Sequence, residues 1–283
     1  MKKNKKSDQP FISIITSTYC AAACLPRVIE SIRAQTFDDF EWIVIDGAST
    51  DGTVDILRQN EDVIDYWMSE PDKGIYDAWN KGLPHVRGTW VLFLGADDYL
   101  WTPDALCRAA VALKAVPPDC RILDGQVAMV NQANEVLWLG GSEWKTIRRR
   151  FRSLMSLPHT ALFHHRDLFQ IHGGFDPAFR IAGDYEFLLR ELTNKRDARF
   201  VDELIVAGMS IGGVSSTPEN SGRMLREARL ATHKHGRFFP GFPWVFAVLR
   251  LKIRQLLGIL LGERQARRML EVERPILRKS AFW

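Results

Sequence analysis

The chain has 283 residues, of which 46% are hydrophobic and 25% are charged, and its net charge is +4. This length suits one large α/β domain with a smaller appendage, and the ordinary composition excludes wholesale disorder. The mild positive charge suits anionic lipid, phosphate ligands or nucleic acid about equally, so it does not select a partner.

Strands and helices are predicted to alternate along the first 118 residues. The predicted strands are short apolar runs at 11–18, 41–46, 62–67 and 90–94. The predicted helices have apolar residues at helical spacing and cover 25–35, 53–59, 73–83 and 103–115. Such alternation, with continuously apolar strands, is typical of a parallel sheet covered by helices on both faces.

The second half of the chain has a different pattern. Further strands are expected at 122–123, 126–130, 135–139 and 200–206, with a hairpin across 131–134 and an apolar run at 161–164. Helices are expected at 166–172 and 184–192, and again in a basic stretch from residue 220. The basic stretch 145–157 is expected to be mobile. Two interpretations stay open for Arg148, Arg149, Arg150 and Arg152: contact with a diphosphate or a lipid phosphate, and a solvated basic loop.

The chain has no clear targeting segment. Lys2–Lys6 and the apolar run before Cys24 faintly resemble a lipoprotein signal, but Asp8, Gln9 and Pro10 interrupt it. The sequence has no run of 18 apolar residues, so no membrane-spanning helix is predicted. The four cysteines lack paired metal-ligand spacing, so we expect reduced thiols in a cytosolic protein.

Polar residues follow three of the predicted strands, at Thr16–Tyr19, Asp46–Asp51 and Asp97–Asp98. The carboxyl ends of parallel strands meet at one edge of the sheet, where ligands bind in such folds. Two adjacent carboxylates repel each other unless a cation neutralises them, which suits a divalent ion that also bridges phosphates. From the pair alone, an alternative remains open: one Asp caps the next helix and the other is solvated.

Four segments follow in order: SIITSTY (13–19), EWIVIDGASTDGT (41–53), SEPDKGIYDAWNKGL (69–83) and WVLFLGADDYL (90–100). Together they resemble the nucleotide-binding half of the inverting family 2 glycosyltransferases, which have the GT-A fold. The resemblance implies a Rossmann-like α/β domain with a mixed, mainly parallel central sheet. Helices would cover both faces, and a helical extension would follow at the C-terminus.

The same resemblance implies residues that bind a nucleotide-sugar donor. Thr18 and Tyr19 match the base pocket, Asp46 the carboxylate that holds the nucleobase, and Asp51 the polar loop that follows. The residues implied near the diphosphate and sugar are Asp72, Lys73, Asp77, Asn80 and Asp97.

Asp97 and Asp98 match the end of the family's Asp-x-Asp element, which implies a divalent cation, Mg²⁺ or Mn²⁺. Many relatives have another Asp where this chain has Gly95. The division of work between Asp97 and Asp98 therefore stays open.

Asp184 opens the predicted helix 184–192 and is the candidate general base, because inverting transfer requires removal of the acceptor's proton. The family commonly has a Glu-Asp pair there, whereas this chain has Gly183-Asp184. A plain helix cap is the alternative for Asp184, and Glu186 is the second candidate base. His159 resembles a histidine at the family's acceptor side, although a lone histidine also serves as a structural hydrogen-bonder.

Residues 238–262 combine aromatic, apolar and basic side chains, which suits a helix lying in a membrane interface. A helix packed on the catalytic domain or on a second subunit is the alternative. We expect a basic tail (1–10), a donor-binding half (11–118), an acceptor-binding half (119–215) and a basic, amphipathic helical extension (216–283).

The predicted function is inverting transfer of a sugar, expected from a UDP-sugar, to a hydroxyl of a glycan or lipid-linked acceptor in polysaccharide biosynthesis. The expected location is cytoplasmic, at the inner face of the plasma membrane. One alternative is a nucleotidyltransferase, although the first strand is followed by TYCAAACLPR and not by a glycine-rich phosphate loop. The other alternative is a catalytically impaired, membrane-peripheral scaffold. Gly95 and Gly183 are the reason for it, because they stand where the family commonly has acidic residues. Nucleic-acid binding is not expected, and the oligomeric state stays open.

Overall fold

The computed structural model of the chain describes residues 9–131, 133–192, 196–210 and 218–261. The strands are β1 (Ile12–Thr18), β2 (Phe40–Asp46), β3 (Tyr66–Ser69), β4 (Trp90–Gly95), β5 (Tyr99–Leu100), β6 (Ile122–Val130), β7 (Val136–Gly140), β8 (Leu162–His165) and β9 (Arg199–Ser210). The α-helices are α1 (Leu25–Arg33), α2 (Thr53–Gln59), α3 (Ile75–Gly82), α4 (Ala105–Lys114), α5 (Trp144–Phe151), α6 (Asp167–His172), α7 (Gly183–Leu192), α8 (Pro218–Lys234) and α9 (Phe242–Leu261).

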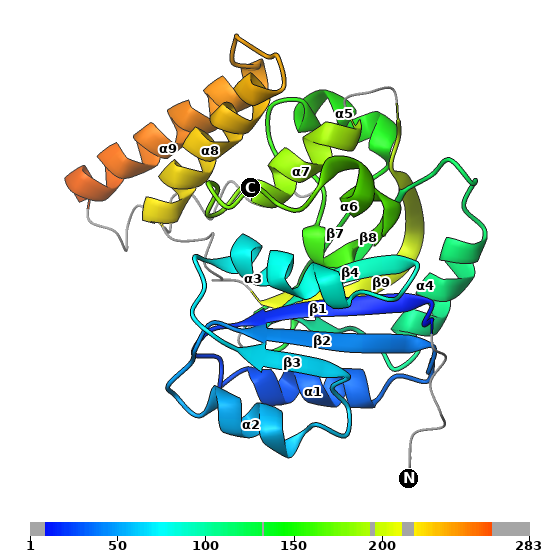
Figure 1. Ribbon diagram of the computed structural model, residues 1–283. Helices are drawn as coiled ribbons and strands as arrows, with labels where there is room; N and C mark the ends of the chain where they lie inside the picture. The colour runs from blue at the N-terminus through cyan, green and yellow to red at the C-terminus, as the bar shows by residue number, and fades with distance from the viewer. Residues whose placement is uncertain (1–8, 132, 193–195, 211–217, 262–283) are drawn as a thin grey trace.

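All these strands belong to one mixed sheet, in the order β3-β2-β1-β4-β8-β6-β9-β5, with β7 paired to β6 (Figure 1). The neighbours β3, β2, β1 and β4 run parallel, as do β6 and β9. β8 is antiparallel to both β4 and β6, and β5 is antiparallel to β9. The expected α/β fold with a mixed sheet is confirmed.

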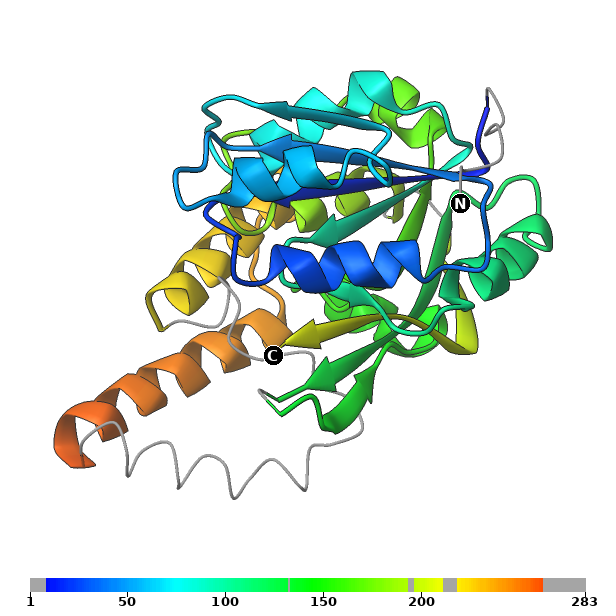
Figure 2. The ribbon, with the colours of Figure 1, turned by 90° about the horizontal axis from the view of Figure 1, so that it is seen from below.

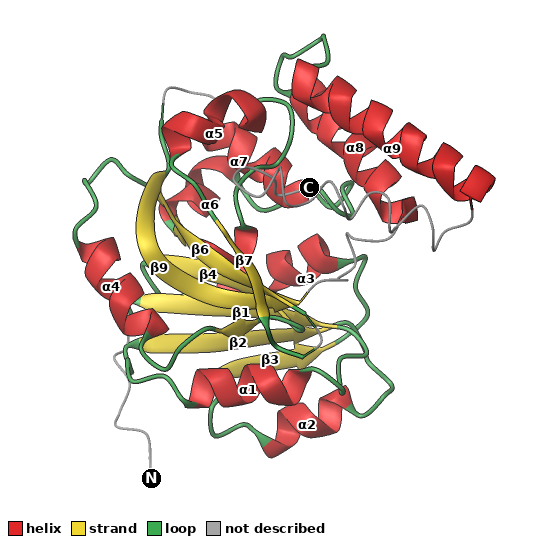
Figure 3. Ribbon diagram, turned by 180° about the vertical axis from the view of Figure 1, so that it is seen from behind, coloured by secondary structure: helices red, strands yellow, loops and turns green. Residues whose placement is uncertain are grey.

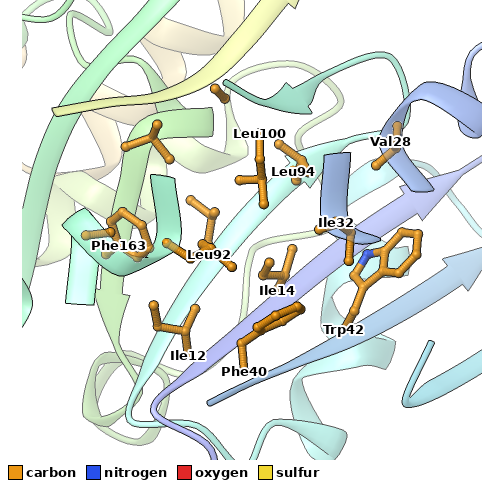
Figure 4. Packing of buried hydrophobic residues seen from close by; sticks show 14 of the residues in the cluster. Ile12, Ile14, Val28, Ile32, Phe40, Trp42, Leu92, Leu94, Leu100 and Phe163 are labelled. Atoms are coloured by element: carbon orange, nitrogen blue, oxygen red, sulfur yellow. The ribbon is translucent and has the colours of Figure 1, made fainter. Parts of the chain in front are cut away.

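The strands are apolar on both sides because the sheet has a core on each face. Ile12 and Ile14 point into one core, which α1, α2 and α4 cover, and Figure 4 shows this packing. Ile15 points to the opposite core, which α3 and the helices of the second half cover. This two-sided burial explains the continuous apolar runs of the parallel strands, and Figure 3 shows helices on both faces.

Most predicted elements are present, with three differences. The weak strand expected at 62–67 is β3, shifted to Tyr66–Ser69. The two strands expected at 122–123 and 126–130 are one continuous strand, β6. The prediction of a loop at 145–157 was wrong for its first half, which belongs to helix α5. Trp144 and Phe151 are buried and hold this basic helix against the core.

Helices α8 and α9 lie side by side, beyond α5, α6 and α7 (Figures 1 and 3). Figure 2 shows α9, in orange, extending away from the sheet. Among the described residues, no helix combines the length and apolarity that crossing a membrane requires. All four cysteines are free, as expected. Most of the expected tail 1–10 and the end of the extension, from residue 262, lie outside the described residues.

Candidate functional site

The carboxyl ends of β1, β2 and β4 form one edge, as the sequence predicted. Thr18 is paired in register with Asp46, and Ser17 with Gly95, so the three strands end side by side. The Thr18 hydroxyl donates a 2.8 Å hydrogen bond to Asp46 Oδ1. The polar residues that follow these strands therefore do meet at one rim.

Asp46 organises the loop that follows β2. Its side chain is fully buried. Besides Thr18, it accepts hydrogen bonds from the backbone N–H of Ser49 (2.9 Å) and from the hydroxyls of Ser49 and Ser69 (2.6 Å each). Four donors occupy both carboxylate oxygens, so Asp46 is held rigidly between β1 and β3.

Asp51 joins two loops of the rim. It accepts hydrogen bonds from the Thr53 hydroxyl (2.5 Å) and backbone N–H (3.1 Å) at the start of α2. Its other oxygen accepts from the backbone N–H of Ala22, 3.0 Å away in the loop after β1. The Thr53 hydrogen bond, foremost, lowers the pKa of Asp51. Asp51 thus satisfies the first backbone N–H of α2.

Tyr19, Gly47 and Asp72 surround one point of the rim. A Cβ on Gly47 would lie 2.5 Å from Asp72 Oδ2 and 3.3 Å from the Tyr19 ring. Tyr19 is 73% exposed, so its ring is accessible to solvent at this point of the rim. Asp72 Oδ1 in turn accepts a 2.7 Å hydrogen bond from Gly74 N–H, where a φ of +118° requires glycine. The absence of a side chain at residue 47 thus lets the two loops approach.

The remaining donor-side residues lie around α3. Asp77 accepts a 2.9 Å hydrogen bond from the backbone N–H of Lys73, whose side chain is exposed. Asn80 exchanges two 2.8 Å hydrogen bonds with the backbone of Phe175, so its amide clamps α3 to the second half of the chain. This geometry gives Asn80 a structural task at the boundary between the two halves.

Asp97 and Asp98 follow β4 directly, with Asp97 exposed and Asp98 5% exposed. Asp98 Oδ2 accepts a 3.2 Å hydrogen bond from Gly95 N–H. Burial, and then the charge of Asp97, raise the pKa of Asp98 to about 8. A Cβ on Gly95 would lie 2.7 Å from Asp98 Oδ2 and 3.1 Å from Asp97 Oδ1. Glycine at residue 95 therefore leaves room for both carboxylates.

The two carboxylates fit a hard divalent cation. They are adjacent oxygen ligands, and their mutual repulsion is relieved when a cation binds between them. Within the described residues, no cluster of three or more His, Cys, Asp or Glu side chains could hold a metal. Any cation at Asp97 and Asp98 would therefore complete its shell with phosphate oxygens and water.

Asp184 lies in the first turn of α7, and two donors hold one of its oxygens. Asp184 Oδ1 accepts a 2.7 Å hydrogen bond from Tyr185 N–H and lies 3.0 Å from the Tyr76 hydroxyl, which shares its one proton with the Ile181 carbonyl 2.8 Å away. No described residue donates to Oδ2, which is left to accept a proton. Burial raises the pKa of Asp184 to about 6, against the lowering effect of the Tyr185 and Tyr76 hydrogen bonds. Such a carboxylate is basic near neutral pH.

Three residues that no sequence pattern indicated, Tyr76, Arg180 and Glu227, hold the segment that leads into Asp184. The Tyr76 ring occupies the space where a side chain at Gly183 would stand, since a Cβ there would lie 2.7 Å from the ring. Glu227 of α8 accepts hydrogen bonds of 2.8–3.0 Å from three successive backbone N–H groups, at residues 180–182. Arg180 donates to the carbonyl of Lys73 and adds a cation beside that loop. These contacts join residues more than 40 positions apart, so no sequence pattern announces them.

The two weaker acceptor-side candidates are both buried in packing. His159 stacks on Trp79 with ring centroids 5.0 Å apart, and burial holds its pKa well below the usual value. Burial alone would raise the pKa of Glu186, but hydrogen bonds from His235 and Arg190 outweigh it and hold the pKa at about 2. Glu186 also pairs with Lys234 at 3.1 Å, so it ties α7 to α8. This arrangement favours a structural role for Glu186.

Residues 13–169 match the model of "Glycosyl transferase family 2". A "PGL/p-HBAD biosynthesis glycosyltransferase" of Mycobacterium bovis is 34% identical over 214 residues, which cover 74% of this chain and 80% of that protein.

Two solved structures share the fold at low sequence identity. Staphylococcus aureus TarS 1–349 in complex with UDP-GlcNAc has a TM-score of 0.60 and 18% identity, covering 78% of this chain and 66% of that one. Mannosyltransferase PcManGT of Pyrobaculum calidifontis, in complex with GDP-Man and Mn²⁺, has a TM-score of 0.61 and 20% identity, covering 94% and 75%.

Proposed function

The chain belongs to glycosyl transferase family 2, and on that premise we propose that it transfers a sugar from a nucleoside diphosphate donor to an acceptor hydroxyl with inversion. The observations that carry the proposal are the shared edge of β1, β2 and β4, where the polar clusters meet, and the contact of Tyr76 of α3 with Asp184 of the second half. The acceptor is a glycan or a lipid-linked glycan of cell-surface polysaccharide biosynthesis. The relatives named "PGL/p-HBAD biosynthesis glycosyltransferase" and "Putative teichuronic acid biosynthesis glycosyltransferase TuaG" support a biosynthetic role.

The donor is a UDP-sugar bound at the rim by Tyr19, Asp46 and the loop of Asp72 and Lys73. The exposed Tyr19 ring offers a face on which a nucleobase stacks. Lys73 and Arg180 supply positive charge beside the diphosphate. One related structure holds UDP-GlcNAc and the other GDP-Man, which supports a nucleoside diphosphate sugar as the class.

A divalent cation, Mg²⁺ or Mn²⁺, would be held by Asp97 and Asp98. When bound, it supplies positive charge that stabilises the departing diphosphate. The Mn²⁺ complex of PcManGT supports this ligand class. Asp98 sits deeper and is fixed by Gly95 N–H, whereas Asp97 is exposed and free to adjust to the donor.

The transfer is one displacement. The acceptor oxygen forms a bond to the anomeric carbon while the bond from that carbon to the diphosphate oxygen breaks. The acceptor proton moves to Asp184 Oδ2, and the nucleoside diphosphate leaves with the electron pair. Asp184 is suited to this task because the hydrogen bonds of Tyr185 and Tyr76 go to Oδ1 and leave Oδ2 without a donor among the described residues.

The chain would work in the cytoplasm at the inner face of the plasma membrane, in peripheral contact through residues 238–262, of which 262 lies outside the described residues. The exposed aromatic side chains of this segment support the contact. The impaired scaffold is less favoured, because Gly95 and Gly183 both make room for site residues.

A donor panel tests the proposal. The full chain would be incubated with UDP-, GDP- and TDP-sugars and either Mn²⁺, Mg²⁺ or EDTA, and nucleoside diphosphate release would be measured. We expect release from one nucleotide class, at least tenfold faster with a divalent cation than with EDTA. Release of pyrophosphate from a sugar phosphate and a nucleoside triphosphate would instead indicate a nucleotidyltransferase. No turnover of any donor, with donor binding retained, would indicate a scaffold.

A further inference from the structure

A cavity of about 310 Å³ lies away from the sheet edge, between the end of α5, helix α8 and the loop from α8 to α9. Its polar wall includes Arg152, Ser153, Arg229, Thr232 and Arg237. Its rim is apolar and contains Phe238 and Phe239. The cavity plays no part in the transfer chemistry proposed above.

The wall of the cavity carries positive charge that no described carboxylate neutralises. Arg229 donates to the carbonyls of Arg237 and Phe238, which fixes the loop, but no ion pair involves Arg152, Arg229 or Arg237 in the described part of the chain. Burial and the neighbouring charge of Arg152 lower the pKa of Arg237. Guanidinium groups that line one cavity without a carboxylate partner are matched by a bound anion, and phosphate suits their planar geometry.

The apolar rim continues into an exposed stripe. Phe238, Phe239 and Phe242 are 68%, 88% and 82% exposed. With about 3.6 residues per turn, the other exposed apolar residues of α9 lie on the same side as Phe242, and these are Val245, Phe246, Leu249, Ile253 and Leu256. A contiguous patch of this kind marks an interaction surface.

The opposite side of α9 packs on the body of the protein. Trp244, Val248 and Leu251 face the core, and Trp244 Nε1 donates a 2.7 Å hydrogen bond to the Leu225 carbonyl of α8. The helix is thus apolar on both sides, and intramolecular packing accounts for only one. Arg250 and Lys252 stand on either flank of the outer stripe.

We infer that the cavity binds the phosphate of an anionic membrane lipid while the Phe238–Phe242 loop and the outer stripe of α9 enter the interface. Three arginines beside a phenylalanine rim combine the two signals that stable interfacial binding requires, namely apolar burial and attraction to anionic headgroups. A free phosphate would use the arginines but would leave the stripe exposed to water. A membrane lipid would engage the arginines through its phosphate and the stripe through its acyl chains.

One hydrogen bond links the segment beside this cavity to the helix that carries Asp184. The Phe151 carbonyl, just before Arg152, accepts a 2.6 Å hydrogen bond from the hydroxyl of Tyr185, which follows Asp184 in α7. The inference rests on the peripheral location proposed above but not on the transfer chemistry, so the catalytically impaired Asp184→Asn variant is expected to bind vesicles like the unmodified chain.

Vesicle flotation of the full chain tests the inference. The vesicles would contain either phosphatidylcholine alone or phosphatidylcholine with phosphatidylglycerol. The pocket variant is Arg152→Gln/Arg237→Gln, and the charge-matched control is Arg58→Gln/Lys114→Gln, which removes two exposed cations from the far face. We expect the unmodified chain and the control to float with anionic vesicles only. The partition coefficient should fall about fivefold for each pocket arginine removed.

Arg152→Gln alone guards against misfolding of the double variant, because Arg152 is exposed. Flotation of the double variant equal to that of the control would overturn the inference, as would equal flotation on both vesicle types. If inorganic phosphate raises the melting temperature only when both arginines are present, yet the unmodified chain does not float, the cavity binds free phosphate and the lipid assignment is wrong.

Discussion

Tyr76, Gly183 and Asp184 act together at the scale of single residues. The Tyr76 ring fills the space that a side chain at residue 183 would need, and its hydroxyl lies 3.0 Å from Asp184 Oδ1. Where the family commonly has a glutamate before this aspartate, the chain thus has a tyrosine that reaches in from α3. Sequence analysis identified Gly183 as a departure, and the contact with Tyr76 gives that departure a physical reason.

Replacing Tyr76 with Phe is expected to move the acid limb of the kcat/KM profile to higher pH. The base must be ionised, so activity falls as the pH drops through the pKa of Asp184, which is about 6. The Tyr76 hydrogen bond lowers that pKa, so its loss raises it. Rates should therefore fall more at pH 6 than at pH 8. Tyr66→Phe is the control, because Tyr66 contacts only Met68 through its hydroxyl, and it should leave the profile unchanged. A Tyr76→Phe profile that drops equally at all pH values would contradict the assignment.

The elements that hold Asp184 come from opposite ends of the chain. Helix α3 supplies Tyr76, and helix α8 supplies Glu227, whose carboxylate satisfies three backbone N–H groups ahead of α7. Buried N–H groups without a partner are costly. Helix α8 therefore supports the loop ahead of α7, a contact that the predicted basic extension beyond residue 216 did not include.

Glu227→Gln is expected to shift the acid limb in the opposite direction from Tyr76→Phe. The charge of Glu227 raises the pKa of Asp184, so the neutral amide lowers it. The weaker acceptor should also reduce the free energy of unfolding by about 1–3 kcal/mol. Glu61→Gln, at an exposed site beside Trp67, is the matched control. Chemical denaturation and the pH profile of kcat/KM measure the two effects. Unchanged stability together with an unmoved profile would show that Glu227 does not support the loop.

How far the sequence predicts the elements depends on the origin of each signal. The α2 bounds were predicted correctly because a polar loop and a short apolar pattern mark both ends locally. β5 has two residues and exists only because it pairs with β9 from far along the chain, so no local pattern predicts it. Helix α5 was missed because its two anchors, Trp144 and Phe151, are separated by a run of arginines.

At the scale of the whole molecule, topology explains what local patterns could not. The first half was predictable because β2 and β4 both pair in parallel with β1. Parallel pairing places the three polar clusters, which follow these strands, at one edge of the sheet. The second half inserts β8 and β6 beside β4 and returns with β9, so its residues meet the rim through long-range contacts. Thr18, Asp46 and Asp98 were found by position, whereas Glu227 and Arg180 required the folded chain.

At the same scale, the structure supports packing for the inner side of α9, where Trp244 bonds to α8. The outer stripe of α9 is exposed. Contact of that stripe with a membrane is the proposal made above.

The most direct test of the account is sugar transfer by Asp184→Asn in a single-turnover assay with saturating donor. The asparagine keeps the size of the side chain and its contact with Tyr76 but cannot take the acceptor proton. We expect unchanged donor affinity by calorimetry and a transfer rate lower by about 10²–10⁴-fold. The control Asp55→Asn, on the exposed surface of α2, should equal the unmodified chain. A variant that binds donor and transfers sugar within about threefold of the unmodified rate would contradict the role of Asp184, because removal of a general base costs far more than that.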